Sequence, residues 1–132
     1  MASAVYPKAL ISLFKGDIDL ETADVKAVLL SASYAYNAAH EFYSDLTGVV
    51  AAETAALASK TFGVVATGVF DAANATVTAA TGDPAVALAL FVDRGGAPTA
   101  DNLLAYLELS ATVTPNGGDI TIAWSDSGIF GI

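Results

Sequence analysis

The residues best suited to acid–base chemistry are His40 and Asp45, which lie close together in the sequence. His40 is the only histidine of the chain, so any Ser-His-Asp device would have to use it. The Gly-x-Ser-x-Gly turn that exposes a nucleophilic serine does not occur. Because catalysis requires a constellation of groups rather than one residue, the favoured interpretation is a structural His40 that caps or hydrogen-bonds within a loop.

Two short serine patterns also occur in the sequence, and neither has the companion motifs of an active site. Ser12-Leu-Phe-Lys15 matches Ser-x-x-Lys, but the Ser-Asp-Asn and Lys-Thr-Gly motifs that accompany it in enzymes are missing. Ser125-Asp-Ser-Gly128 lies at a terminal strand or turn with no second motif. No glycine-rich phosphate loop is present, and Arg94 is the only arginine. The sequence therefore predicts no catalytic residue, no cofactor and no enzymatic activity.

Four acidic residues close together have the oxygen ligands that hard cations prefer: Asp17, Asp19, Glu21 and Asp24. An EF-hand loop that began at Asp17 would need glycine at its sixth position and glutamate at its twelfth, where this sequence has Thr22 and Val28. A solvated acidic loop is the favoured interpretation, and a weak calcium site of another kind is the alternative.

Four tyrosines are candidate interface residues: Tyr6, Tyr34, Tyr36 and Tyr43. Tyr34 and Tyr36 fall in a predicted loop, where exposed rings could anchor a partner or stack on a sugar. The favoured alternative is that these rings fold back onto the core. Whether the rings are buried or exposed decides between the two interpretations.

Short apolar runs separated by turn residues predict the elements that position these side chains. Residues 1–7 are predicted to form an extended arm, either a disordered tail in the isolated subunit, which is slightly favoured, or an arm that orders on a neighbour. Residues 8–15 are predicted to form a short helix ended by Gly16. Loops are predicted over residues 17–24 and 31–39, with one helical turn over residues 41–46. Residues 60–70 are predicted to form one strand or a strand pair with a bulge or kink at the glycines, and strands are predicted over residues 25–30, 75–80 and 85–92. The last of these is apolar on both faces, which is typical of a central strand between two layers.

The strongest structural signal lies near the C-terminus, where two alternating runs flank a turn rich in Pro, Asn and Gly. This pattern predicts a β-hairpin made by residues 103–109 and 120–124. Alternate apolar side chains of each strand would share a face and form a dense layer. Many short strands with turns between them predict a mainly β, single-domain antiparallel β-sandwich or barrel-like fold over residues 1–132.

Composition limits the partners that the chain can bind. It has 132 residues, a formal net charge of −9 and no cysteine, so disulfides and thiolate metal sites are excluded. The negative charge repels nucleic acid and anionic lipid, and we expect neither nucleic acid nor a membrane as partner. Hydrophobic residues make up 55% of the chain, which predicts apolar surface covered by other subunits. The N-terminus lacks the layout of a signal peptide, so cytoplasmic synthesis is expected.

Four segments together resemble a family of small bacteriophage virion proteins: Asp17-Ile-Asp-Leu20, residues 40–46, Phe70-Asp-Ala72 and residues 102–129. Their order and spacing carry the resemblance. It implies a capsid decoration (cement) or head-fibre protein, with Ile18 and Leu20 as core anchors of the acidic loop. It also favours extended structure over residues 47–58, where alanine propensity alone would favour a helix.

The resemblance implies a non-enzymatic structural protein that binds the outer surface of a phage capsid and stabilises the shell. The expected partners are the major capsid protein and further copies of the chain, as a homotrimer because shells offer three-fold sites. The expected location is the virion, after synthesis in the cytoplasm of the bacterial host. A protein that binds only the assembled lattice stabilises it by mass action. The alternatives are a tail, neck or head-fibre component, or a carbohydrate- or host-surface-binding β module.

Overall fold

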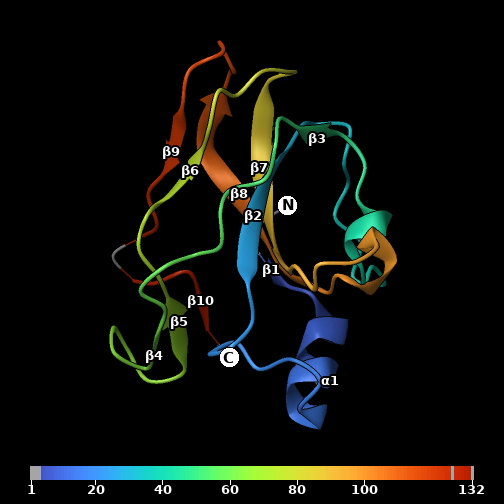
Figure 1. Cartoon of the computed structure of the whole chain (residues 1–132), viewed down its shortest axis with the longest axis vertical. Coiled ribbons are helices and arrows are strands. Elements are labelled where there is room, and N and C mark those ends of the chain that lie inside the picture. The colour runs from blue at the N-terminus through green and yellow to red at the C-terminus, as the bar shows by residue number, and fades with distance from the viewer. Residues whose placement is uncertain (1–3, 126, 132) are drawn as a thin grey trace.

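The computed structural model describes residues 4–125 and 127–131. Those residues form a mainly β structure of antiparallel strands with one short α-helix near the N-terminus, as predicted (Figure 1). The main sheet has the strand order β1-β8-β7-β2-β3. Its strands are β1 (Ala4–Val5), β8 (Leu103–Val113), β7 (Ala85–Val92), β2 (Val25–Leu30) and β3 (Val49–Val50).

Two smaller sheets lie beside the main sheet. One has the order β10-β5-β4, with β10 (Phe130–Gly131), β5 (Val69–Asp71) and β4 (Thr61–Phe62). The other pairs β6 (Ala75–Val77) with β9 (Ile120–Ile122). The sheets are therefore open and antiparallel, in keeping with a sandwich-like arrangement that is not closed into a barrel.

The ladder between β2 and β7 forms the centre of the structure. It runs without interruption from the pair Val25 and Val92 to the pair Leu30 and Ala87. Apart from Val86, every residue of β7 is buried, which confirms the predicted central strand. Because successive side chains of a strand point to opposite faces, a strand buried in this way needs cover on both sides of the sheet.

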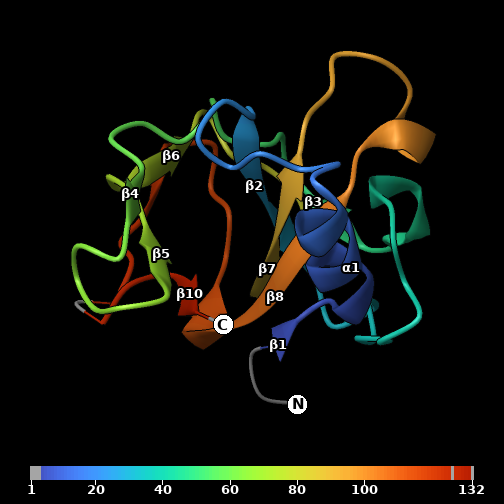
Figure 2. The same cartoon turned by 90° about the horizontal axis from the view of Figure 1, so that it is seen from below.

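Different parts of the chain cover the two faces of the main sheet. On one face, Leu88 and Leu107 line the same hollow as Ile122 and Ile129, so the smaller sheets and the C-terminal segment pack there. On the other face, the ring of Phe91 meets that of Tyr43, with centroids 4.7 Å apart. Figure 2 shows these two coverings on opposite sides of the main sheet.

Helix α1 (Pro7–Lys15) confirms the predicted N-terminal helix. Pro7 occupies its first turn, where a missing N–H costs no hydrogen bond, and Gly16 ends it with φ +79. Ala9 and Ser12 face the core. The opposite side of α1 carries Ile11 and Phe14, which are 55% and 76% exposed.

The predicted hairpin of residues 103–109 and 120–124 is wrong. β8 pairs with β7 and with β1, whereas β9 pairs with β6, where Thr76 lies opposite Thr121. The glycines between β8 and β9 do not close a tight turn across those two strands. Instead, Ala80 donates to the carbonyl of Gly118 at 2.9 Å, and Gly117 donates to the carbonyl of Ala80 at 2.7 Å. The ladder with β7 thus competes successfully with local hairpin pairing.

Two other segments refine the predictions. Residues 60–70 form a hairpin of β4 and β5, which confirms the strand-pair alternative, and its turn holds Gly63 and Gly68 with φ +75 and +79. Residues 47–58 contain no helix, so the alternative favoured by alanine propensity is wrong; Val49–Val50 is strand β3, and the rest of the segment is irregular, with Ala51 at φ +62. The amides of Thr54 and Leu57 donate to carbonyls of β2, at Ala27 and Val25, so this segment continues the sheet edge irregularly.

The predicted N-terminal arm is docked on its own chain. Ala4 and Val5 pair with Tyr106 and Ala105 of β8, and Tyr6 is completely buried. Pro7 already belongs to α1. Residues 1–3 of the predicted arm lie outside the described residues. An arm reaching over a neighbour therefore cannot use Tyr6 in this conformation.

The strand pairing can be tested with introduced cysteines, because the chain has none of its own. Thr76→Cys with Thr121→Cys is expected to form a disulfide on mild oxidation, since opposed residues of an antiparallel pair lie within disulfide range. The matched control, Thr112→Cys with Thr121→Cys, joins residues that a β8–β9 hairpin would oppose and is expected to stay reduced. Mass spectrometry after thiol labelling measures both, and the reverse result would restore the hairpin.

Candidate functional site

A cluster of four tyrosines forms the most distinctive polar feature of the core. This tyrosine cluster consists of Tyr6, Tyr34, Tyr36 and Tyr106, and it lies on the face of the main sheet opposite the smaller sheets. The ring centroids of Tyr6 and Tyr36 are 5.1 Å apart, and those of Tyr36 and Tyr106 are 5.5 Å apart. These tilted contacts at 4.5–7 Å are favourable for aromatic pairs.

A chain of hydrogen bonds runs through the cluster. The hydroxyls of Tyr6 and Tyr34 are 2.7 Å apart, and the Tyr34 hydroxyl lies 2.8 Å from Nδ1 of His40. When Nδ1 accepts, Tyr34 donates to His40 and Tyr6 donates to Tyr34. Each buried hydroxyl then has a partner, as buried polar groups require.

Burial keeps these hydroxyls protonated. Desolvation raises the pKa of Tyr6 far above its usual value, and the hydrogen bond to Tyr34 raises it further. Desolvation also raises the pKa of Tyr34, partly opposed by the hydrogen bond from Tyr6. Tyr6 and Tyr34 therefore act as neutral hydroxyls whose hydrogen bonds connect loop 31–48 to the N-terminal segment.

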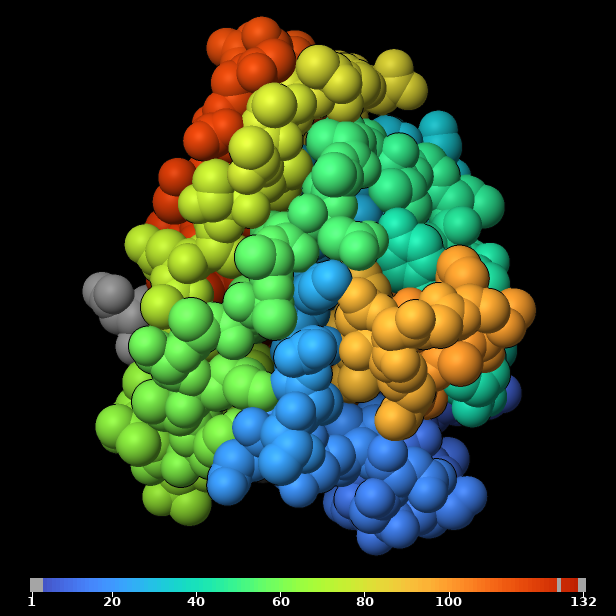
Figure 3. All heavy atoms as spheres, viewed as in Figure 1, coloured from blue at the N-terminus to red at the C-terminus, as the bar shows by residue number. Residues whose placement is uncertain are grey.

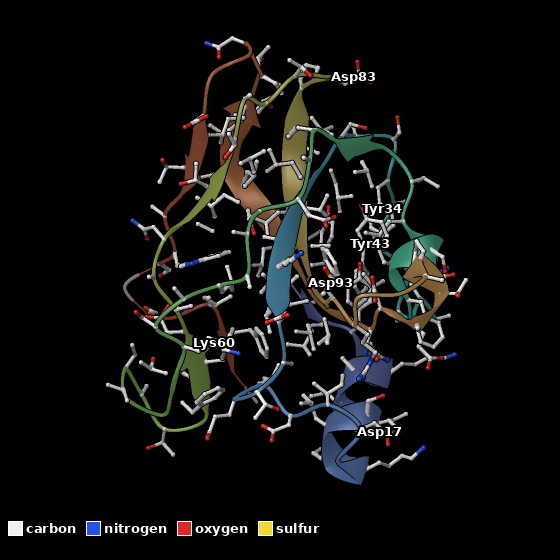
Figure 4. The ribbon with its side chains drawn as sticks, in the orientation of Figure 1. Asp17, Tyr34, Tyr43, Lys60, Asp83 and Asp93 are labelled. Atoms are coloured by element: carbon white, nitrogen blue, oxygen red, sulfur yellow. The ribbon has the colours of Figure 1, made fainter. Side chains whose placement is uncertain are left out.

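The predicted interface tyrosines differ in their exposure. Tyr6 and Tyr34 are buried, with 0% and 5% of their surface exposed. Tyr36 and Tyr43 are half-buried and pack against the core. The rings of Tyr34 and Tyr36 thus fold back, as the favoured interpretation predicted, and Figure 4 shows Tyr34 and Tyr43 on the same side of β2. Only Tyr36 and Tyr43 retain surface for a partner.

The hydrogen bonds of His40 and Asp45 give both residues structural roles. His40 is bonded to Tyr34, whereas Oδ2 of Asp45 accepts the amides of Glu41 and Phe42 at 2.9 and 3.0 Å. The hydrogen bond from the Glu41 amide, followed by that from the Phe42 amide, lowers the pKa of Asp45. The carboxylate thereby caps the 3₁₀ turn Tyr43–Asp45, which lies in the predicted helical turn 41–46.

The structure also shows where the serine patterns and the acidic loop lie. Ser12 is buried in α1, and Nζ of Lys15 lies 3.6 Å from Asp17. Ser125 accepts the amide of Ser127 in a turn, and Asp126 between them lies outside the described residues. In the part of the chain that the structure describes, no group of three or more His, Asp or Glu side chains is placed to hold a metal ion.

Two cations, which sequence reasoning missed, hold the acidic loop in place. Nζ of Lys60 donates to the carbonyls of Leu20 and Ala23 at 2.7 and 2.5 Å. Arg94 donates from Nη2 to the carbonyl of Asp17 at 3.0 Å and also binds Oδ1 of Asn102. The loop is thus fixed through its backbone, which leaves its carboxylates at the surface.

A polar hollow of about 320 Å³ lies beside Tyr43, bordered by Glu53, Asp93 and Asp101. Desolvation, followed by the charges of Glu53 and Asp101, raises the pKa of Tyr43. Nζ of Lys26 lies 2.6 Å from Oδ2 of Asp93 and 3.7 Å from Glu53. An aromatic ring beside carboxylates is suited to bind groups that donate hydrogen bonds.

The turn between β4 and β5 is an exposed apolar feature that the sequence reasoning did not single out. Val64 is 75% exposed and Val65 is 42% exposed. The signal was present in the sequence, because residues 61–70 contain no charged side chain although the net charge of the chain is −9. Contiguous apolar residues at a surface mark contact sites more reliably than scattered ones.

Comparison with known protein families and curated proteins identifies no relative of the chain. No model of a known protein family matches the chain, and no curated protein matches it. Within residues 4–125 and 127–131, no helix has the length and hydropathy to cross a membrane. The family resemblance therefore stays a prediction, and the function has to be argued from the surface.

The hydrogen-bond chain of the tyrosine cluster leads to a stability prediction. Tyr34→Phe is expected to destabilise the protein by about 1–3 kcal/mol, because it leaves the buried hydroxyl of Tyr6 without its partner. Tyr6→Phe is the matched control and is expected to cost less, since Tyr34 keeps its bond to His40. In urea unfolding, the double variant should lose less than the sum of the two single losses. Equal losses of unfolding free energy in the two single variants would contradict this chain of hydrogen bonds.

The ion pair of Lys26 and Asp93 leads to a pH prediction. The hydrogen bond from Lys26, followed by the Gly95 amide, lowers the pKa of Asp93 below its usual 3.8. This carboxylate therefore stabilises the fold above pH 3.8, and the contribution is lost as the pH falls through the lower, folded pKa. The unfolding free energy of Asp93→Asn should fall less steeply than that of the wild type from about pH 5 to pH 2. An unchanged slope in Asp93→Asn would contradict the assignment.

Proposed function

We propose that the chain is a non-enzymatic structural protein of a bacteriophage virion that binds the outer surface of the capsid and stabilises the shell. The observation that carries the proposal is the uncharged turn between β4 and β5, whose Val64 is 75% exposed on a strongly acidic protein. Apolar surface of this kind is stabilised when another protein covers it. The resemblance of the four sequence segments to phage virion proteins supports a capsid as that protein.

The charge distribution supports a place on the outside of the shell. A net charge of −9 repels packaged DNA, so an external location avoids an unfavourable interaction. The turn is held by a short hairpin in which Thr61 pairs with Asp71 and Phe62 with Phe70. Because β5 also pairs with β10, the hairpin is held in a three-stranded sheet, which would let two valines enter a gap between neighbouring capsid subunits at a lower cost in ordering.

The mechanism of stabilisation is non-covalent. A protein that binds the assembled lattice, and not its free subunits, shifts the equilibrium toward the lattice by its binding free energy. Repeated copies at equivalent sites multiply this effect over the shell. The major capsid protein is the proposed partner, and a tail, neck or head-fibre position is the alternative place in the virion.

A second candidate function is a carbohydrate- or host-surface-binding module. The specific observation in its favour is the hollow beside Tyr43, where carboxylates of Glu53, Asp93 and Asp101 could accept hydrogen bonds from sugar hydroxyls. Tyr34 does not contribute to such a surface, because it is buried. Of the two predicted tyrosines that keep exposed surface, Tyr36 and Tyr43, only Tyr43 lines this hollow.

Cryo-electron microscopy of the parent virion tests the location. Copies at regular sites on the outer capsid surface, with the β4–β5 turn against the shell, are the expected result. Density confined to the tail or neck would replace decoration by the alternative position. Absence of the chain from the virion would overturn the structural assignment and favour the module that uses Tyr43.

Rebinding of the purified protein to shells stripped of it tests the contact. Val64→Asp with Val65→Asp is expected to reduce shell binding about tenfold or more, because it places charge where apolar surface is covered. Asp83→Ser is the matched control at the opposite end of the molecule from Asp17 (Figure 4) and should bind as the wild type does. Equal binding by all variants would exclude the turn as the contact.

A further inference from the structure

The outward side of α1 combines apolar and basic side chains. Ile11 and Phe14 point away from the core and are 55% and 76% exposed. Lys8 and Lys15 flank them, with 46% and 67% of their side chains exposed. Their surface pairs with Glu41 and Asp17, at 3.5 and 3.6 Å, are of a kind that contributes little stability. We call Ile11, Phe14, Lys8 and Lys15 the helix knob.

The other three cations of the chain are committed to contacts within it. Lys26 is bound to Asp93, Lys60 to two loop carbonyls, and Arg94 to Asn102 and Asp17. The helix knob is therefore the part of the described surface where basic groups can turn to a partner by giving up only weak surface ion pairs.

A hollow with an apolar lining and an acidic border lies beside the acidic loop. Its apolar lining includes Leu20, Phe62, Phe70 and Phe130, over a volume of about 340 Å³. An adjoining hollow of about 450 Å³ shares Leu20 and Phe62 and is bordered by Asp19 and Glu21. Phe62 remains 43% exposed. We call this apolar hollow with its acidic rim the socket.

The fold holds the rim of the socket rigidly. The two bonds from Lys60 fix the backbone at Leu20 and Ala23, on either side of Glu21. Oδ1 of Asp19 accepts the amide of Glu21 at 3.0 Å, which orients the turn. Figure 3 shows the acidic loop between the green β4–β5 hairpin and the blue helix α1, so socket and knob lie at the same end of the molecule.

We propose that the helix knob of one copy of the chain docks in the socket of a second copy. Phe14 and Ile11 would enter the apolar hollow, while Lys8 and Lys15 would meet Asp19 and Glu21 on its rim. The two surfaces match in both hydrophobicity and charge, and they belong to the same chain. A nucleic acid or an anionic membrane would meet the acidic rim unfavourably.

This contact joins two unlike surfaces of identical chains, so it is heterologous, and such contacts close into rings when the rotation permits. A homotrimer is one such ring. The inference does not rest on the proposed function, because the purified chain alone should associate. The socket is lined in part by Gly63 and Gly68 of the β4–β5 turn, so a docked knob would lie beside that turn, although Val64 and Val65 themselves do not line the socket.

Sedimentation equilibrium of the full chain over a concentration series at low salt tests the proposal. The wild type is expected to associate reversibly, and Phe14→Ser should raise the dissociation constant about tenfold or more by removing a buried aromatic ring. Lys15→Glu and Glu21→Lys should each weaken association, because each places like charges across the contact. The chain that carries both reversals should associate more strongly than either single variant.

Asp83→Lys is the matched control for Glu21→Lys, since it changes the net charge equally at the other end of the molecule. It should not weaken association. Thermal unfolding checks that the variants, all at exposed positions, keep the fold. A wild type that stays monomeric at all concentrations would overturn the proposal, as would a double reversal no stronger than the single ones. If the wild type associates with itself but does not bind stripped shells, that result would count against the proposed function alone.

Discussion

The structure depends on one constraint, which is that β7 is buried on both faces and paired on both edges. The ladder with β2 satisfies one edge and the ladder with β8 satisfies the other. Two exposed faces of such a ladder would leave much apolar surface in water, so each face requires a cover. The smaller sheets supply one cover, and the segment that carries Tyr34 and Tyr43 supplies the other. The loops and helix α1 are placed so that neither face of the β7 ladder is left open to water.

Polar side chains then fix the parts that regular pairing does not reach. Lys60 and Arg94 hold the acidic loop by its carbonyls, Asp45 caps the 3₁₀ turn, and Tyr34 connects the N-terminal segment to His40. In each case a side chain satisfies groups that a loop leaves unpaired. Residues that looked suited to chemistry in the sequence serve this purpose here. The surface that remains for partners is apolar or acidic except at α1, where Lys8 and Lys15 are exposed.

Local patterns in the sequence were sufficient for the helix, for β2 and β7, and for the loops, because apolar periodicity and Gly16 report local structure. They failed at the C-terminus, where the pattern of a hairpin was strong but the pairing was not local. The choice between β7 and β9 as the partner of β8 depends on burial summed over the whole sheet, which no local pattern shows. The contact of Tyr34 with Tyr6 was equally invisible, since it joins distant segments. The uncharged run 61–70 was visible and could have indicated the exposed turn.

The order of the main sheet also affects how the chain is made. β1 and β2 leave the ribosome first, but β2 needs β7, and Ala4 pairs with Tyr106 near the other end of the chain. Closing such long loops is entropically costly and slow. The nascent chain must therefore carry apolar strands without partners until β8 has emerged. Acidic residues spread between those strands keep such a chain apart from its neighbours during synthesis, which gives the large negative charge a role before the protein has folded.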